Sequence, residues 1–100
     1  MRILSFNTLA AFWATHPETK ASLEHWYQVA SAASWASSND VMTTFPKAKL
    51  INDERVRFEV AGGNYRMIVA FKYRAQIAFV KFLGMHAEYD KINAETVSYF

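Results

Sequence analysis

The chain has 100 residues, of which 52% are hydrophobic and 16% aromatic, and its formal net charge is +2. This length suits one domain with a compact core. The absence of cysteine excludes disulfides and thiolate metal sites. No apolar run approaches the roughly 18 residues needed to span a membrane, and the amino end lacks the features of a signal peptide, so we expect a cytoplasmic protein that does not bind membranes.

The first residues predict a short strand followed by a helix. The strand is expected over residues 2–5. Asn7 or Thr8 can cap a helix that runs to residue 14. This helix must end before Pro17, because proline disfavours helical geometry in the residue before it.

Pro17 also suits the first turn of a second helix. Residues 34–39 indicate a loop, and residues 40–45 a short third helix that Pro46 ends. The second helix carries one apolar stripe at helical spacing, formed by Leu23, Trp26, Tyr27, Ala30 and Ala33.

After Pro46 the period changes from helical to alternating. In residues 55–60, Val and Phe alternate with charged side chains, which is typical of a half-buried strand. The following segments predict an antiparallel meander: a hairpin turn over residues 61–64, strands over residues 65–73 and 77–84, and about one helical turn from residue 86.

Helices followed by a meander predict one α+β domain over residues 1–100, with the N-terminal helices packed on a small antiparallel β-sheet whose other face is partly open. Charge is unevenly divided between these parts. Residues 1–46 carry two basic and three acidic side chains, a sum of −1, whereas residues 47–91 carry nine basic and five acidic ones, a sum of +4. A basic sheet is typical of a surface that binds a polyanion, and an ordinary solvated face is the alternative.

No metal or cofactor site is predicted, because His16, His25 and His86 are far apart and lack a ligand partner at helical spacing. The densest chemical cluster is residues 84–91, GMHAEYDK, which hold an imidazole, a phenol, a carboxylate and an ammonium group. Histidine suits proton transfer, and tyrosine can donate a hydrogen bond or stack on a base. Capping and packing at the end of the chain is the alternative role.

RNA can be cleaved when its own 2′-hydroxyl attacks the adjacent phosphate. The guanidinium of Arg66, near the hairpin turn, would offer a fixed fork of donors to phosphate oxygens. In the predicted meander, Arg66 and His86 are expected toward opposite ends of neighbouring strands, unless the hairpins stagger them.

Four blocks of the sequence, covering about residues 8–96, resemble a HigB toxin of the RelE superfamily. In chain order they are TLAAFWATHPETKASLEHWYQVASAASW, NDERVRFEV, GGNYRMIVAF and FVKFLGMHAEYDKINAET. The last block is the most specific, a strand followed by G-x-H-x-x-Y-D-K-I. The resemblance implies the toxin of a type II toxin-antitoxin system, an endoribonuclease (mRNA interferase) that cleaves translated mRNA in the decoding site of the 70S ribosome. It also implies a helix-turn-helix antitoxin of the HigA type, through which alone the toxin would contact operator DNA.

The resemblance further implies four catalytic residues. Arg66 matches a phosphate-binding arginine, and His86 lies where RelE relatives carry a basic residue after the glycine of the last strand. Tyr89 matches the tyrosine of the terminal motif, and Lys81 matches a position that is usually basic. The other basic side chains predicted to bind RNA are Arg55, Arg57, Lys47, Lys49, Lys72 and Lys91.

The hairpin departs from the family pattern. Close relatives carry a lysine at its end, whereas residues 59–64 read EVAGGN. Glu59 places an acid on the face expected to meet RNA, and Arg57 is the candidate to compensate for the missing lysine. Met85 stands where threonine is common.

Two other functions stay open: a non-catalytic RNA- or ribosome-binding module, and a regulatory subunit of a DNA-binding toxin-antitoxin complex. An antitoxin could cover the basic face or bind the first two helices. We favour the helices, because the basic face offers no obvious apolar anchor of the kind that stable interfaces use.

Overall fold

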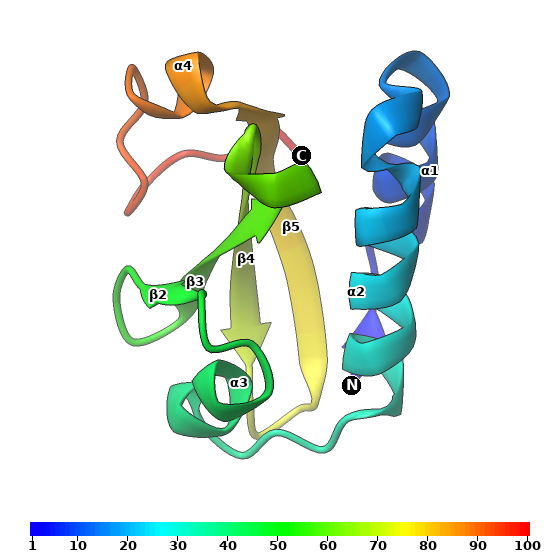
Figure 1. The fold of residues 1–100 in the computed structure, drawn as a ribbon. Coiled ribbons are helices and arrows are strands. Elements are labelled where there is room, and N and C mark those ends of the chain that lie inside the picture. Colours follow the sequence, from blue (N-terminus) through cyan, green and yellow to red (C-terminus); the bar gives the residue numbers. More distant parts are fainter.

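In the computed structural model, which describes residues 1–100, five strands form one sheet with helices packed against it (Figure 1). No helix combines the length and the hydropathy that crossing a membrane requires. In chain order the elements are β1 (Arg2–Ile3), α1 (Phe6–Thr15), the 3-10 turn η1 (Pro17–Thr19), α2 (Lys20–Ala32), α3 (Ser38–Thr44), β2 (Lys49–Leu50), β3 (Arg55–Val60), the 3-10 turn η2 (Ala61–Gly63), β4 (Tyr65–Lys72), β5 (Ile77–Met85) and α4 (His86–Tyr89).

The predicted α+β fold is confirmed, and β3, β4 and β5 form the expected antiparallel meander. Two short strands extend it, so that the order across the sheet is β1-β5-β4-β3-β2. β2, which the sequence did not predict, pairs antiparallel with β3, whereas β1 lies parallel to β5. The sheet is therefore mixed rather than wholly antiparallel. A long connection through the helices joins β1 to the rest of the sheet, and such a connection permits parallel pairing where a tight hairpin does not.

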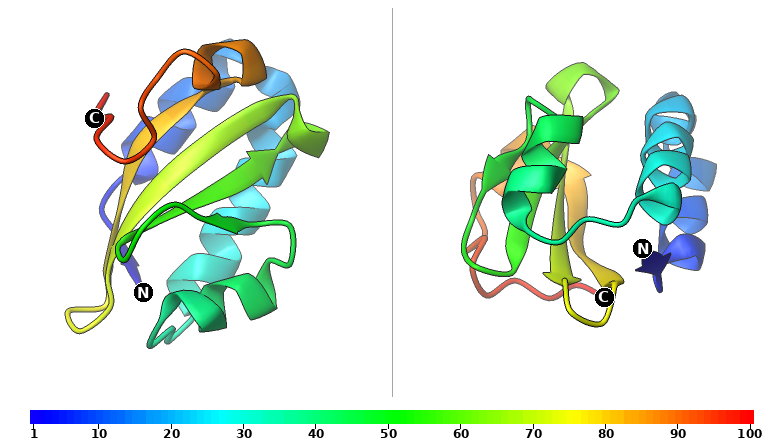
Figure 2. Two further views of the ribbon diagram at one scale, coloured as in Figure 1. Left: turned by 90° about the vertical axis from the view of Figure 1, so that its left-hand side faces the viewer. Right: turned by 90° about the horizontal axis from the view of Figure 1, so that it is seen from below.

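The helices α1 and α2 cover one face of the sheet, which we call the helix face (Figures 1 and 2). Val56, Phe58 and Val60 point from β3 into the core on this side and are almost fully buried. They meet the apolar stripe of α2, where the Trp26 ring packs at 5.5 Å from that of Phe58. The alternation in residues 55–60 and the helical stripe therefore formed the core as predicted.

The opposite face, which we call the open face, is partly covered by the C-terminal segment, residues 90–100 (Figure 2). Ile68 of β4 pairs with Phe82 of β5, and both are fully buried although they point away from the core of the helix face. The ring of Tyr99 packs on Phe82 with centroids 5.1 Å apart. The guanidinium of Arg55 donates two hydrogen bonds to main-chain oxygens of the same segment. These contacts fix the segment across the sheet.

Two helices begin earlier than predicted, and in both the expected side chain or its neighbour makes another hydrogen bond. α1 begins directly after Ser5, whose buried hydroxyl accepts the Val80 amide at 2.9 Å instead of capping the helix. α3 begins at Ser38, two residues before Asp40, whose carboxylate accepts the Ala36 amide at 2.8 Å.

Candidate functional site

Arg66 and His86 lie at the same end of the sheet, which corrects the expectation that they lie toward opposite ends. Arg66 pairs with Gly84 near the end of β5, and His86 begins α4 two residues later. In an antiparallel pair the first residues of one strand face the last residues of its neighbour. The main-chain N–H of His86 also donates to the carbonyl of Asn64 in the hairpin turn at 3.1 Å.

A group of cationic and aromatic side chains lies on the open face beside this end. The Cζ atoms of Arg57 and Arg66 lie 5.6 and 5.7 Å from the centre of the Tyr89 ring. Glu59 stands directly opposite Arg66, so Arg57, two residues before Glu59, is the diagonal neighbour of Arg66 on the same face. The Tyr89 ring packs against buried Phe82, with centroids 6.1 Å apart. We call Arg57, Arg66 and Tyr89 the guanidinium cluster.

Neither arginine of the guanidinium cluster has an acidic partner. The Nε atoms of Arg57 and Arg66 are buried without a hydrogen-bond partner, and neither guanidinium forms an ion pair. Glu59, the acid expected to disturb this face, approaches Gly63 in the turn instead. Two unpaired guanidiniums beside one ring favour an anion between them, and phosphate oxygens match their donor geometry.

His86 is half exposed and has a carboxylate at its side. Its Nδ1 lies 3.2 Å from Asp90 Oδ2, and 52% of its side chain is accessible. A carboxylate on one ring nitrogen orients the imidazole and leaves Nε2 free for proton exchange. The sequence analysis found no ligand partner for His86 at helical spacing, and this was wrong, because Asp90 lies four residues after His86 on the same side of the helical turn.

Gly84 lets α4 approach the sheet. A Cβ atom at this position would lie 2.9 Å from Cζ of Phe82 and 3.1 Å from Oε1 of Glu88. The glycine therefore permits the close packing of α4 on β5. This packing sets the positions of His86 and Tyr89, the first and last residues of α4.

Lys81, predicted as catalytic, makes no interaction with the guanidinium cluster in this structure. It sits where the pairing of β5 with β4 shifts by one residue, and its Nζ lies 5.4 Å from the Phe79 ring. No hydrogen bond, ion pair or cation–π contact joins it to Arg66, His86 or Tyr89.

Two of the residues predicted to bind RNA make contacts within the protein. Arg55 holds the C-terminal segment through the two hydrogen bonds described above. Lys72 forms an exposed ion pair with Glu54 at 2.7 Å, at the opposite end of β4 from Arg66. Their guanidinium and ammonium groups are therefore not gathered with the guanidinium cluster.

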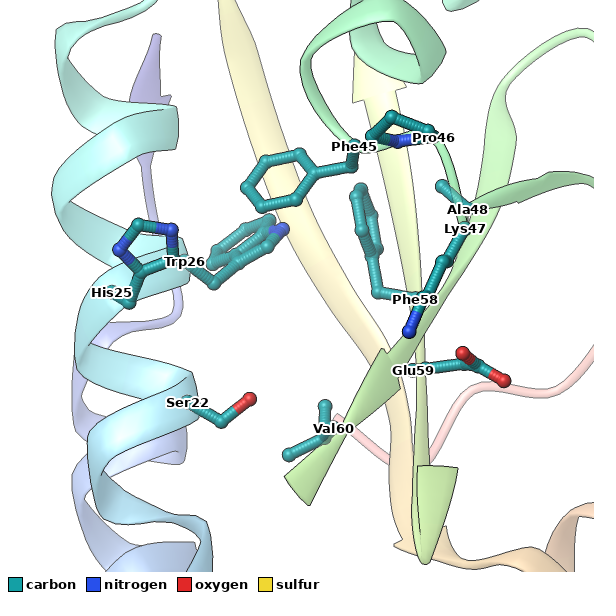
Figure 3. Close-up of a pocket in the computed structure, with 10 residues that line it drawn as sticks. All are labelled: Ser22, His25, Trp26, Phe45, Pro46, Lys47, Ala48, Phe58, Glu59 and Val60. Atoms are coloured by element: carbon teal, nitrogen blue, oxygen red, sulfur yellow. The ribbon is translucent and has the colours of Figure 1, made fainter. Parts of the chain in front are cut away.

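The other three predicted RNA-binding residues lie at different positions relative to the guanidinium cluster. Lys49 stands opposite Arg57 in the sheet and shares its face. Lys91 is exposed just after α4. Lys47 instead lines a pocket of about 370 Å³ between α2 and β3, beside Trp26 and Phe58 (Figure 3).

A second pocket, of about 590 Å³, opens beside His86, and we call it the Glu18 pocket. Tyr65 in its wall donates a hydrogen bond to the Glu18 carboxylate. This bond lowers the pKa of Glu18 and raises the pKa of Tyr65. The two residues are 47 positions apart, so no local spacing could reveal the pair. The pocket is lined by Glu18, Gly63, Asn64, Tyr65, Met85, His86 and Ala87.

The remaining histidines pack against aromatic rings. His16 stacks on Phe12 with centroids 4.3 Å apart, and His25 lies edge-on to Phe45 at 6.4 Å. The structure contains no group of three or more His, Cys, Asp or Glu side chains arranged to hold a metal ion.

Helices on one face of an antiparallel meander, with a basic face beside α4, form an α+β domain that is consistent with the RelE-like toxins. A family model described as HigB_toxin, RelE-like toxic component of a toxin-antitoxin system, matches residues 19–92, about three quarters of the chain. The chain therefore belongs to the HigB_toxin family, whose members act with an antitoxin partner. No curated protein matches the sequence.

Proposed function

We propose that the protein is a ribosome-dependent endoribonuclease that cleaves translated mRNA, without a metal ion, by attack of the 2′-hydroxyl on the adjacent phosphate. The observation that carries this proposal is the position of two unpaired guanidiniums, Arg57 and Arg66, beside the Tyr89 ring. Two forks of donors fit the oxygens of one phosphate group, and the ring fits a base that has left its stack.

In this reaction the bond between O2′ and phosphorus forms while the bond between phosphorus and O5′ breaks. A base removes the proton of the 2′-hydroxyl, and the departing O5′ receives a proton. His86 carries out one of these transfers, because imidazole both accepts and donates protons near neutral pH. Arg66 and Arg57 stabilise the charge that develops on the phosphorane. Tyr89 positions the nucleotide.

We propose a path for the RNA that follows the exposed cations around the guanidinium cluster. Lys49 extends the basic surface from Arg57, and Lys91 extends it beyond α4. Lys81, whose Nζ lies over the Phe79 ring, would add a further positive charge. The substrate is mRNA in the decoding site of the 70S ribosome, so the protein would act in the cytoplasm.

The antitoxin partner is, in this proposal, a helix-turn-helix protein of the HigA type that docks on α1 and α2. These helices present exposed aromatic side chains: Phe6 is 42% accessible and contacts the rings of Trp13 and Tyr27. Aromatic residues are the usual anchors of protein interfaces. Docking there adds bulk that prevents access to the ribosome, and the toxin would contact operator DNA only through the antitoxin.

Primer extension on a translated message tests the nuclease directly, with the parent compared with His86→Ala. New mRNA ends in the parent that disappear in the variant support cleavage by this protein. Growth inhibition without new ends would favour a non-catalytic ribosome-binding module. Expression without any growth inhibition would favour a regulatory subunit of the antitoxin complex.

A further inference from the structure

We propose that the Glu18 pocket binds a guanine base of the RNA, with Glu18 as the residue that determines specificity. The assignment rests on the nuclease function proposed above, since it places the base of a nucleotide whose phosphate lies at the guanidinium cluster. The pocket lies beside His86, at the end of the sheet where β4 begins and β5 ends.

The pocket and the guanidinium cluster lie on two sides of this end of the sheet. Tyr65 and Arg66 are adjacent in β4, and adjacent side chains of a strand point to opposite faces. Tyr65 belongs to the buried core of the helix face and forms a wall of the pocket. Arg66 points to the open face, where Tyr89 lies against it. His86 lines the pocket at the start of α4, so a nucleotide could place its base in the pocket and its phosphate beside Arg66.

The pocket offers hydrogen-bonding groups that bonds within the protein do not use fully. The Glu18 carboxylate accepts hydrogen bonds from the Tyr65 hydroxyl and from its own main-chain N–H, and it forms no ion pair. A carboxylate has about four lone-pair sites, so acceptor sites remain for a ligand. The hydrogen bond from Tyr65 lowers the pKa of Glu18, so the carboxylate is ionised at neutral pH. Asn64 uses its main-chain groups in the turn, and its side chain is exposed. Met85, 51% accessible, supplies an apolar surface for the face of a base.

Among the four bases, guanine matches a carboxylate best. Its Watson–Crick edge presents two adjacent donors, N1–H and the N2 amino group, and the remaining lone-pair sites of the Glu18 carboxylate can accept from both. The corresponding edges of adenine, cytosine and uracil each place an acceptor beside a donor, and a carboxylate repels that acceptor. Splayed bases of single-stranded RNA are read in this way, by hydrogen bonds to their edges and by contact with their faces.

Titration of the purified protein with 3′-GMP and 3′-AMP tests this assignment, because each nucleotide carries both a base and a phosphate. We expect 3′-GMP to bind at least about tenfold more tightly, with NMR shifts at the amides of Asn64 and Ala87. Glu18→Gln should abolish the preference while the amide oxygen still accepts the Tyr65 hydroxyl. Glu24→Gln is the matched control, since it makes the same change at an exposed position of α2 outside the pocket.

Equal binding of the two nucleotides by the parent, or a preference that survives Glu18→Gln, would overturn the assignment. The two proposals are separated by mapping mRNA ends in cells. Cleavage without enrichment of guanine next to the cut would overturn the pocket assignment and leave the nuclease intact. A guanine preference in the titration, together with no cleavage in cells, would support the pocket and contradict the nuclease.

Discussion

Arg55 donates a hydrogen bond of 2.7 Å to the main-chain oxygen of Val97, which lies 42 residues further along the chain. The same guanidinium binds the oxygen of Ala94 at 3.0 Å. These bonds connect β3, the strand that carries Arg57, to the segment that follows α4, the helix that carries Tyr89. Arg55 therefore links the strand that carries Arg57 to the segment next to Tyr89.

We expect Arg55→Ala to lower the free energy of unfolding by about 3 kcal/mol, because it removes two hydrogen bonds and each bond from a charged donor contributes roughly 1.5–3 kcal/mol. Urea denaturation measures this change, and hydrogen exchange should show faster exchange in residues 94–99. Lys72→Ala is the control, since its exposed ion pair with Glu54 contributes at most about 1 kcal/mol. A fully stable Arg55→Ala protein would show that these bonds are dispensable.

Arg66→Ala should abolish growth inhibition while the protein still folds and binds its antitoxin. Loss of one donor aimed at the charge of a transition state typically reduces the rate by about 100- to 1,000-fold. Cleavage assays on translated message measure the loss, and Lys72→Ala, at the other end of β4, should keep its activity. Full toxicity of a well-expressed Arg66→Ala protein would remove this residue from the active site.

Substitutions at Tyr89 distinguish stacking from hydrogen bonding. The centre of its ring lies 5.6 and 5.7 Å from two guanidiniums, and the ring packs against Phe82. If stacking positions the substrate, Tyr89→Phe keeps most of the cleavage activity and Tyr89→Ala loses it. Equal losses in the two variants would assign the role to the hydroxyl. Both are compared with His86→Ala, which should lose most cleavage on purified ribosomes.

The hydrogen bond between Tyr65 and Glu18 should make stability depend on pH. The pKa of Glu18 is lowered by this bond, so the bond stabilises the fold above the ordinary value of 4.5 and its contribution is lost as the pH falls through the lower folded pKa. We expect Tyr65→Phe to lower Tm at neutral pH and to change it less in acid. Thermal denaturation across this range measures the difference. A deficit in Tm that is the same at every pH would mean that packing, and not the carboxylate, is responsible.

Charge reversal in a co-purified toxin-antitoxin complex locates the docking surface. Reversal at Glu18 and Glu24 alters the helical side, whereas reversal at Arg57 and Arg66 alters the open face. Docking on α1 and α2 predicts that the first pair weakens the complex and that the second pair leaves it bound. Release of the antitoxin only by the changes at the arginines would show direct occlusion of the active site instead.

Local periodicity was enough to predict most of the fold. The alternation in residues 55–60 and the stripe that includes Leu23 and Trp26 each mark the side of one element that is buried. Such a pattern repeats over a few neighbouring residues, so it can be read from the sequence alone. The parallel pairing of β1 with β5 was not predictable in this way, because it depends on where the helices return the chain. The packing of Tyr99 on Phe82 was not predictable either, because it depends on how the C-terminal segment returns to the sheet.

The candidate site was only partly visible in the sequence. Arg66, His86 and Tyr89 were found through the resemblance of their motifs, and strand register then placed the first two at one end of the sheet. Arg55 looks like any other basic residue on a strand, and only the tertiary fold shows that its guanidinium binds the C-terminal segment. Glu18 meets the site through a residue 47 positions away, which no local pattern encodes.

The close approach of α4 to β5 at Gly84 also indicates which substitutions could remove the activity of such toxins during evolution. A side chain at this position would strike the Phe82 ring and the Glu88 side chain of α4, and we expect it to displace α4 together with His86 and Tyr89. Genetic selection for cells that survive the toxin should therefore recover substitutions of Gly84. A homologue that keeps Arg66, His86 and Tyr89 but carries a larger residue here is expected to be non-toxic and still to bind its antitoxin.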